Sequence, residues 1–304
     1  MNAAEPSDIA VKPRPPSPGL GLGAPRPGEE PDLQLVANLG YRARWRHAVW
    51  DLSESFRLSE LFRALGWLDI KIKYRGSVLG PFWLTISTGV LVATLGVLYG
   101  ELFHLKLHDF LPFIALSLVL WNFISMLIGD ACLAFTQAES TIRSVRMPYF
   151  VFVGQNVYRN LIILAHNLVV IVVVFALFRI VPGWKALAAL PALALWLVDS
   201  YALTILLGAF CARFRDVPQI VASILQIAFY VTPIIWKPSL LPVRQRWILP
   251  IDPFYSLFEI VRGPLLGTLP SHIVWASALG YSAALCAIAW LGFVRVRARI
   301  AFWI

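Results

Sequence analysis

The chain has 304 residues, of which 59% are apolar and 14% are charged, and its formal net charge is +9. A soluble domain of this length would be about half apolar and a quarter charged, so the composition excludes that class and predicts an integral membrane protein. The three cysteines, Cys132, Cys211 and Cys286, lack the spacing of a metal site and imply no disulfide framework.

The first forty residues contain eight prolines and scattered charges, a composition that cannot bury a core. We therefore predict a disordered cytoplasmic tail over residues 1–45. Three glycines, Gly19, Gly21 and Gly23, have the spacing of a nucleotide-binding loop, but Pro25 interrupts the helix that should follow and no Gly-Lys-Ser/Thr appears. A flexible linker is the better interpretation, and the chain has no visible phosphate loop.

The segment from Asp51 to Ile72 places apolar residues at three- and four-residue steps, with most charges on other faces. This pattern predicts an amphipathic helix within an interface region over residues 46–78. Asp51 and Glu54 have the spacing of a helix-capping box. The helix either lies in the membrane interface or docks a soluble partner, and the basic residues beside a true span favour the first.

The stretch from Gly66 to Trp83 passes from charged to apolar residues. Lys and Arg at the headgroup level are attracted to anionic lipid by about 1 kcal/mol each, whereas charges in hydrocarbon are costly. We therefore predict that the chain enters the membrane here from the cytoplasmic side. The charges stand in the first half of the stretch, at Asp69, Lys71, Lys73 and Arg75.

Six apolar runs of spanning length follow, within a predicted transmembrane domain over residues 79–304. With the tail inside, the inner segments hold 19 of the 26 Lys and Arg residues, so both termini are predicted to be cytoplasmic. The fold class is thus an all-α membrane protein with six transmembrane helices. The predicted spans are Leu79–Leu98, Phe110–Ile128, Leu161–Phe178, Ala186–Phe210, Pro218–Trp236 and Ile273–Val294.

Two connections have patterns of their own. The cytoplasmic segment Glu139–Tyr158 mixes charge with aromatic residues, and it predicts a short amphipathic helix that ends near Pro148. A cytosolic subunit would dock on this helix, at Glu139, Arg143 and Arg146. An ordinary loop is the alternative. The outer segment Lys237–His272 holds six prolines around an apolar stretch, which predicts re-entrant outer helices between spans five and six.

Four segments together resemble one family, the permease subunits of ABC-2 type exporters that move polysaccharides such as O-antigen, capsule and teichoic acid. The resemblance covers the chain from about Leu58 to its end, with the motifs in the family's order. The segments are DIKIKYRGSVLGPFW at Asp69–Trp83, RFRDVPQI at Arg213–Ile220, LQIAFYVTPIIW at Leu225–Trp236 and DPFYSLFEIVRGPLL at Asp252–Leu266. The long Pro-rich tail and Asp199 within a span depart from the family's pattern.

The resemblance implies a homodimer in the bacterial inner membrane, paired with separate ABC ATPase subunits. ATP and Mg would bind to those partners, so this chain would carry no cofactor and no catalytic residue. Its substrate would be a lipid-linked glycan that moves outward from the cytoplasmic side. We expect contacts with membrane lipids and no nucleic-acid partner.

Three cations and a tyrosine at the inner headgroup level form a candidate gate for the phosphate-bearing lipid end of the substrate. Cations there can pair with phosphate through charge-assisted hydrogen bonds. The alternative is that they only anchor the chain in the membrane. The residues are Lys71, Lys73, Tyr74 and Arg75.

Four aromatic residues are candidates for a glycan path, because sugar faces stack on aromatic rings. Interface anchoring or core packing is the alternative for all four. They are Trp83, Trp121, Tyr230 and Trp236.

Asp199 lies near the middle of predicted span four, and His166 lies near the middle of span three. An unpaired carboxylate at that depth costs at least about 2.5 kcal/mol. We predict an intramembrane polar pair of His166 with Asp199, with a water-lined path or a protonated, unpaired Asp199 as alternatives.

Two other functions are alternatives to glycan export. A drug or small-lipid exporter would share the fold, and the Asp69–Trp83 motif favours glycans over it. An integral membrane transferase acting on lipid-linked sugars would need convergent His and acidic residues. The histidines are scattered, and the pair His104 and His108 near Asp109 has no evident third ligand, so no metal site is predicted.

Overall fold

The computed structural model describes residues 40–80, 82–102, 104 and 106–304. The predicted tail over residues 1–45 lies mostly outside the described residues, although the first helix already begins at Tyr41. The described residues are helical with loops and contain no strand. The all-α prediction is therefore confirmed for this part of the chain.

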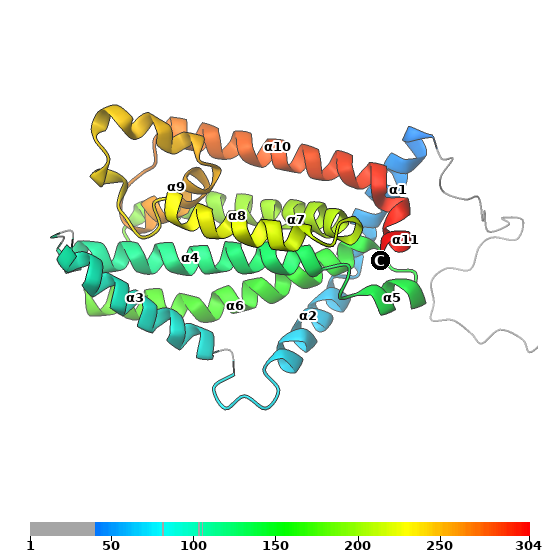
Figure 1. Ribbon diagram of the computed structural model, residues 1–304, viewed down its shortest axis with the longest axis horizontal. Helices are drawn as coiled ribbons and strands as arrows, with labels where there is room; N and C mark the ends of the chain where they lie inside the picture. The colour runs from blue at the N-terminus through cyan, green and yellow to red at the C-terminus, as the bar shows by residue number, and fades with distance from the viewer. Residues whose placement is uncertain (1–39, 81, 103, 105) are drawn as a thin grey trace, which may run out of the picture. The chain divides into compact units, whose positions relative to one another are not determined.

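Within the described part of the chain, five helices are long and apolar enough to cross a membrane. They are α3 (Phe82–Leu102), α4 (Leu107–Leu133), α6 (Tyr149–Leu177), α7 (Ala189–Arg213) and α10 (His272–Val296). Figure 1 shows α3 inclined to the other long helices, which run along the long axis of the picture. Four of the five begin and end close to the predicted spans, whereas α6 starts twelve residues earlier because the segment Tyr149–Asn160 is also helical.

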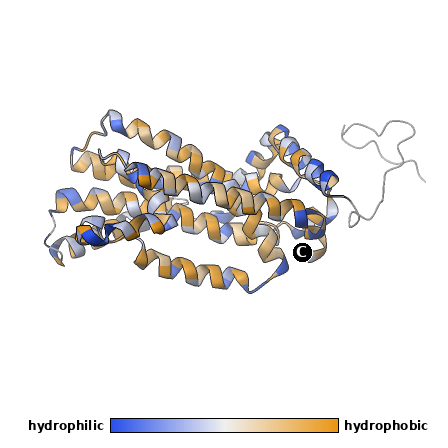
Figure 2. Ribbon diagram, turned by 90° about the horizontal axis from the view of Figure 1, so that it is seen from above, coloured by the Kyte–Doolittle hydropathy of each residue, from blue (hydrophilic) through white to orange (hydrophobic). Residues whose placement is uncertain are grey.

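Helix α4 is the centre of the core, because α3, α6, α7, α8 and α9 all pack against it. Its residues from Ile114 to Leu116 are fully buried. The other spans expose apolar residues outward, as expected of helices that face lipid. In Figure 2 the long helices are mostly orange along their length, and blue residues gather toward their ends.

The predicted fifth span is shorter than expected. Helix α8 (Val217–Val231) has 15 residues, or about 22 Å, whereas hydrocarbon is about 30 Å thick. The helix ends because Thr232 precedes Pro233 and adopts an extended conformation, which a following proline favours. The remainder of the predicted span, to Trp236, is non-helical.

The amphipathic segment is two helices rather than one. Helix α1 (Tyr41–Arg57) and α2 (Ser59–Lys73) meet at Leu58. Asp51 lies inside α1, so the predicted capping box is wrong. The carboxylate instead accepts hydrogen bonds from the Tyr149 backbone N–H at 3.1 Å and from Arg297 at 3.0 Å, which ties α1 to the start of α6 and the end of α10.

The outer connection contains three short elements, η3 (Pro238–Leu240), η4 (Val243–Ile251) and α9 (Pro253–Leu265). Asp252 caps α9 by accepting a hydrogen bond from the Phe254 backbone N–H at 2.9 Å. Helix α9 packs against α7, α10 and η2 (Trp184–Ala188), and most of its second half is buried. These elements lie at the opposite end of the bundle from α1, α5 (Glu139–Ser144) and α11 (Ile300–Trp303) (Figure 1). Following the predicted topology, we call the end with α1, α5 and α11 the inner end and the opposite end the outer end.

Candidate functional site

Helix α2 lies directly against the inner part of α6, and two glycines allow the close approach. A Cβ atom at Gly154 would lie 2.9 Å from the Phe62 ring, and one at Gly66 would lie 3.0 Å from the Gln155 carbonyl oxygen. Larger side chains at these positions would push the helices apart. The contact fixes α2 beside the residues that carry the first polar cluster.

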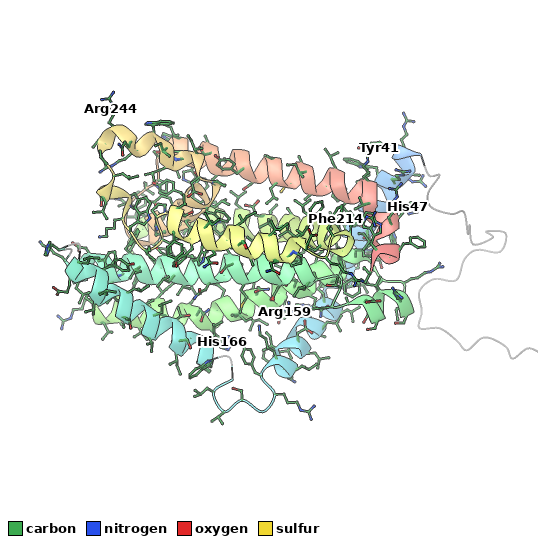
Figure 3. The ribbon with its side chains drawn as sticks, viewed as in Figure 1. Tyr41, His47, Arg159, His166, Phe214 and Arg244 are labelled. Atoms are coloured by element: carbon green, nitrogen blue, oxygen red, sulfur yellow. The ribbon has the colours of Figure 1, made fainter. Side chains whose placement is uncertain are left out.

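Arg159 bridges two acidic residues from different helices. Its Nη1 lies 2.8 Å from Asp69 Oδ2 of α2, and its Nη2 lies 3.0 Å from Asp130 Oδ2 of α4. The arginine side chain is 13% exposed, and the two carboxylates are 26% and 24% exposed. Figure 3 labels Arg159 where α6 passes behind α4 and close to α2. Partial burial strengthens both ion pairs over those of a fully solvated surface.

Amides extend this cluster to a fourth helix. Asn156 accepts a hydrogen bond from Arg159 at 3.1 Å and donates one to Thr204 of α7 at 3.1 Å. Asn160 donates to Asp130, also at 3.1 Å, and Gln155 donates to Asp69 at 2.8 Å. Hereafter this set is the inner polar cluster: Asp69, Asp130, Gln155, Asn156, Arg159, Asn160 and Thr204.

Sequence reasoning missed the inner polar cluster. Arg159 entered only the charge count, and Asp69 only the description of the entry stretch. One signal was present: Asn156, Arg159 and Asn160 recur at three- and four-residue steps, which places them on one face of a helix. The two acidic partners of Arg159 lie 29 and 90 residues away from it in sequence, so the sequence alone could not reveal these ion pairs.

The predicted gate follows the inner polar cluster directly. Lys71, Lys73 and Arg75 are exposed, and within the described residues none of them forms an ion pair with a carboxylate. Tyr74 is half-buried, and both its burial and the nearby Asp130 charge raise the pKa of its hydroxyl. The four residues stand together at the end of α2.

The loop after the gate reaches the side of α6. It turns at two glycines, Gly76 and Gly80, with φ of 80° and 53°. Helix α3 then begins with the Phe82 ring 5.4 Å from His166, while Thr85 donates a hydrogen bond to Asn167 at 3.2 Å. Helix α6 is about 44 Å long, so its length exceeds a hydrocarbon layer of about 30 Å by roughly a third of the helix.

The predicted docking helix is α5, which ends at Ser144 rather than near Pro148. Val145 adopts an extended conformation there, and Arg146 follows it in an exposed segment. Arg143 pairs with Glu139 at 3.0 Å and also donates to the Ile304 carbonyl. Helix α5 is therefore braced by the end of α11.

The four aromatic candidates do not form one group, and of the four only Tyr230 and Trp236 share a hydrogen bond among the described residues. Trp121 is 7% exposed and contacts Phe229, Phe254 and Phe258 within the core, as the packing alternative expects. Trp83 and Tyr230 are 61% and 60% exposed on α3 and α8. The Trp236 indole N–H donates to the Tyr230 carbonyl at 3.2 Å.

The structure does not form the predicted pair of His166 and Asp199. His166 Nδ1 lies 2.8 Å from the Ile162 carbonyl oxygen of its own helix, and the ring faces Phe82 (Figure 3). Asp199 faces α10, where its Oδ2 accepts a hydrogen bond from Ser282 Oγ at 2.7 Å. The two side chains leave α6 and α7 toward different neighbours, so this prediction is corrected.

A second buried arginine lies at the outer end. Arg262 of α9 is 1% exposed and donates to Ser117 at 2.8 Å, to the Pro233 carbonyl at 2.7 Å and to Glu259 at 2.7 Å. Its guanidinium lies 4.3 Å from the Phe113 ring centroid. An open cavity of about 1250 Å³ lies beside it, lined by polar and aromatic residues that include Lys237, Trp247, Tyr255, Glu259 and Tyr281.

His108 lies 3.0 Å from Asp109, and within the described ranges no group of three or more His, Cys, Asp or Glu side chains is arranged to hold a metal ion.

The family model of the ABC-2 type transporter matches residues 60–266. A Myxococcus xanthus protein named O-antigen export system permease protein RfbA is 24% identical over 206 residues, covering 67% of this chain and 79% of the relative. Two Klebsiella pneumoniae proteins of the same name are 20% and 23% identical, each over 62% of this chain and 73% of the relative.

Proposed function

The chain belongs to the ABC-2 type transporter family, and on that premise we propose that it is the membrane permease of a polysaccharide exporter. Its cargo is a lipid-linked glycan, and ATP hydrolysis on a separate ABC ATPase subunit drives export. The relatives' names support the class of cargo. The observation that carries the proposal is the exposed cation cluster at the end of α2, which stands beside the inner polar cluster.

The proposed topology has six crossings in the bacterial inner membrane, with both termini cytoplasmic. Helix α8 and the non-helical Thr232–Trp236 together make the fifth crossing. Thr232, Pro233 and Ile234 are buried by protein, which supports irregular backbone at membrane depth. Helix α9 is the re-entrant element on the outer side.

The gate cations would receive the phosphate-bearing end of the substrate. Ammonium and guanidinium groups form strong hydrogen bonds to phosphate, and here no carboxylate competes for Lys73 or Arg75 among the described residues. The same helix carries Asp69, which Arg159 holds to α4 and α6. Movement of α2 would therefore open the gate and strain the inner polar cluster in one step.

The ATPase would dock on α5, because α5 is short, charged and braced by α11. Motion delivered there can reach the gate through rigid contacts. Asp51 joins α1 to α6 and to Arg297, and α2 follows α1 after one residue. Helix α8, with no buried residue, supplies the face on which a second copy of the chain would pair.

The outer cavity would hold sugar as it leaves. Its rings and mixed polar groups suit carbohydrate, which stacks on aromatic faces and hydrogen-bonds at its edges. A purely apolar cargo would gain little from Lys237 and Glu259 in the same wall. The cavity thus favours a glycan over a small lipid.

Deletion of the gene tests the proposal in cells. Loss of this chain should lower surface glycan and cause the lipid-linked glycan to accumulate inside, and the intact gene should restore export. Normal surface glycan in the deletion strain would overturn the proposal. A lipid-linked glycan of altered composition would instead identify a transferase.

A further inference from the structure

A second cavity, of about 350 Å³, lies within the membrane-spanning part of the fold. Four helices line it, with Phe123 and Leu127 from α4, Leu203 from α7, Leu257 from α9 and Leu285 from α10. Its volume falls in the range of small-molecule sites, which are mainly apolar with few polar groups. The cavity shares Tyr281 with the outer cavity and none of the gate residues.

The polar side chains around this cavity are nearly all bonded within the protein. The Trp196 indole donates to the Leu257 carbonyl, Ser200 to the Trp196 carbonyl, and Tyr281 to the Ile251 carbonyl. Ser282 gives its hydroxyl proton to Asp199. No side-chain donor of the described lining is left to bind a ligand.

Asp199 differs from these neighbours. It is 5% exposed, one carboxyl oxygen accepts from Ser282 at 2.7 Å, and the other, Oδ1, is buried without a hydrogen-bond partner. A buried acceptor without a partner is costly, more so when the group can carry charge. Rotation about the terminal torsion is soft, so either oxygen can turn toward the cavity.

We propose that this cavity is a binding site for a lipophilic amine, whose alkyl chain fills the apolar space and whose ammonium group donates to Asp199. An amine supplies the missing donor and neutralises the carboxylate by a charge-assisted hydrogen bond. An alcohol would supply the donor without the charge, and a hydrocarbon would supply neither. The ligand is thus distinct from the phosphate-bearing glycan lipid assigned to the gate.

The test uses photolabelling of the full chain in native membrane vesicles. Decylamine with a terminal diazirine is the probe, and decanol and decane with the same diazirine are matched controls. Labelled peptides are mapped by mass spectrometry. We expect the amine to label α7 and α10 around Leu203 and Leu285 about tenfold more than decane does, with unlabelled decylamine competing.

Two variants separate the site from general lipid contact. The double change Asp199→Leu with Ser282→Ala removes both polar partners together, which limits damage to folding, and it should reduce amine labelling to the decane level. Ser282→Ala alone keeps Asp199 and should retain amine labelling. Leu203→Phe should reduce labelling by all three probes because it fills the cavity.

Three results would overturn the proposal. Equal labelling by amine and decane would show an apolar crevice without recognition, and stronger labelling by decanol would show that charge is not recognised. Unchanged amine labelling in the Asp199→Leu, Ser282→Ala variant at normal protein level would place the amine elsewhere.

Discussion

The two ends of the bundle each bury an arginine, but they use it differently. Arg159 at the inner end pairs with acids on two other helices, α2 and α4, and both acids are about a quarter exposed. Arg262 at the outer end pairs with Glu259 of its own helix and fixes α9 to Ser117 and to the Pro233 carbonyl.

This difference indicates which end can move. The pair within α9 cannot separate when helices shift, and the Arg262 guanidinium is fully enclosed and lies on the Phe113 ring. At the inner end, the Arg159–Asp69 ion pair breaks when α2 moves away from α6, and water can then reach the partly exposed Asp69, which lowers the cost of breaking the pair. We therefore expect the outer end to stay rigid and the inner end to move more readily. The following predictions run from the largest expected loss of folding stability to the smallest.

Arg262→Leu should cost the most. The change leaves Glu259 without its ion-pair partner and leaves the Ser117 and Pro233 acceptors without their donor. Breaking a buried ion pair in this way lowers the free energy of unfolding by about 3–5 kcal/mol. The protein level in membranes should fall sharply, and the detergent-solubilised remainder should unfold at lower temperature. Glu259→Gln in the same chain should recover part of the loss. Normal yield and thermal stability for Arg262→Leu would contradict the view that Arg262 keeps the outer end rigid.

Arg159→Leu should cost less, about 1–3 kcal/mol, because its partners keep some contact with water. The variant should insert but fail to export glycan. Asp69→Asn and Asp130→Asn, tested singly and together, should show coupled effects on stability, because one guanidinium holds both acids. Additive effects on stability, with export intact, would contradict the view that Arg159 holds Asp69 and Asp130 as one coupled unit.

Asp51 sharpens the comparison, since it is a fully buried acid at the inner end. Burial raises the pKa of its carboxyl, against the opposing Arg297 charge. The folded protein then binds more protons than the unfolded chain above the ordinary pKa of about 4, so stability should fall as pH rises from there through the raised pKa. Thermal unfolding of Asp51→Asn should depend less on pH across this window. An equal slope in the two proteins would rule out this titration.

The double change Arg143→Glu and Arg146→Glu should lower stability by only about 1 kcal/mol, because both residues are exposed, although Arg143 also loses its Glu139 and Ile304 partners. It should reduce co-purification of the ATPase subunit or uncouple ATP hydrolysis from export. The matched control reverses two exposed charges at the outer end, Arg244→Glu and Arg246→Glu, which should leave ATPase binding unchanged. Intact assembly and coupling in the inner variant would place docking elsewhere.

The smallest effect on folding is expected for Lys73→Gln with Arg75→Gln, which removes two exposed charges from the gate. Export and substrate-stimulated ATP hydrolysis should stop, while insertion and ATPase binding continue. If the cations only anchor the chain, export survives, because Arg57, Arg63 and Lys71 still set orientation. Normal surface glycan at normal protein level would therefore decide for anchoring.

The long helices could be predicted from sequence because apolar runs such as that of α4 are a local signal. The early end of α8 also had a local cause, Pro233, but its effect was underestimated. The break at Leu58 had no comparable signal, because the apolar periodicity continues across it.

The gate stays a prediction, because its residues are neighbours in the chain and the structure only shows its three cations exposed, whereas the side-chain pairings that depend on helix packing were missed or wrong. Lys71, Lys73 and Arg75 stand together in the chain and also in the fold. Asp199 was recognised as needing a partner, yet Ser282 lies 83 residues away and no periodicity connects them. Pairings of this kind follow from how helices pack against one another, which a single sequence does not determine.

The central claim is tested most directly by transport in inside-out membrane vesicles. These would contain this chain and its ATPase partner, with radiolabelled lipid-linked glycan added outside. The account predicts that the glycan becomes protected from an added glycosidase only when ATP and both proteins are present. Protection without this chain, or ATP-driven transport of a small amphiphile while the glycan stays accessible, would contradict it.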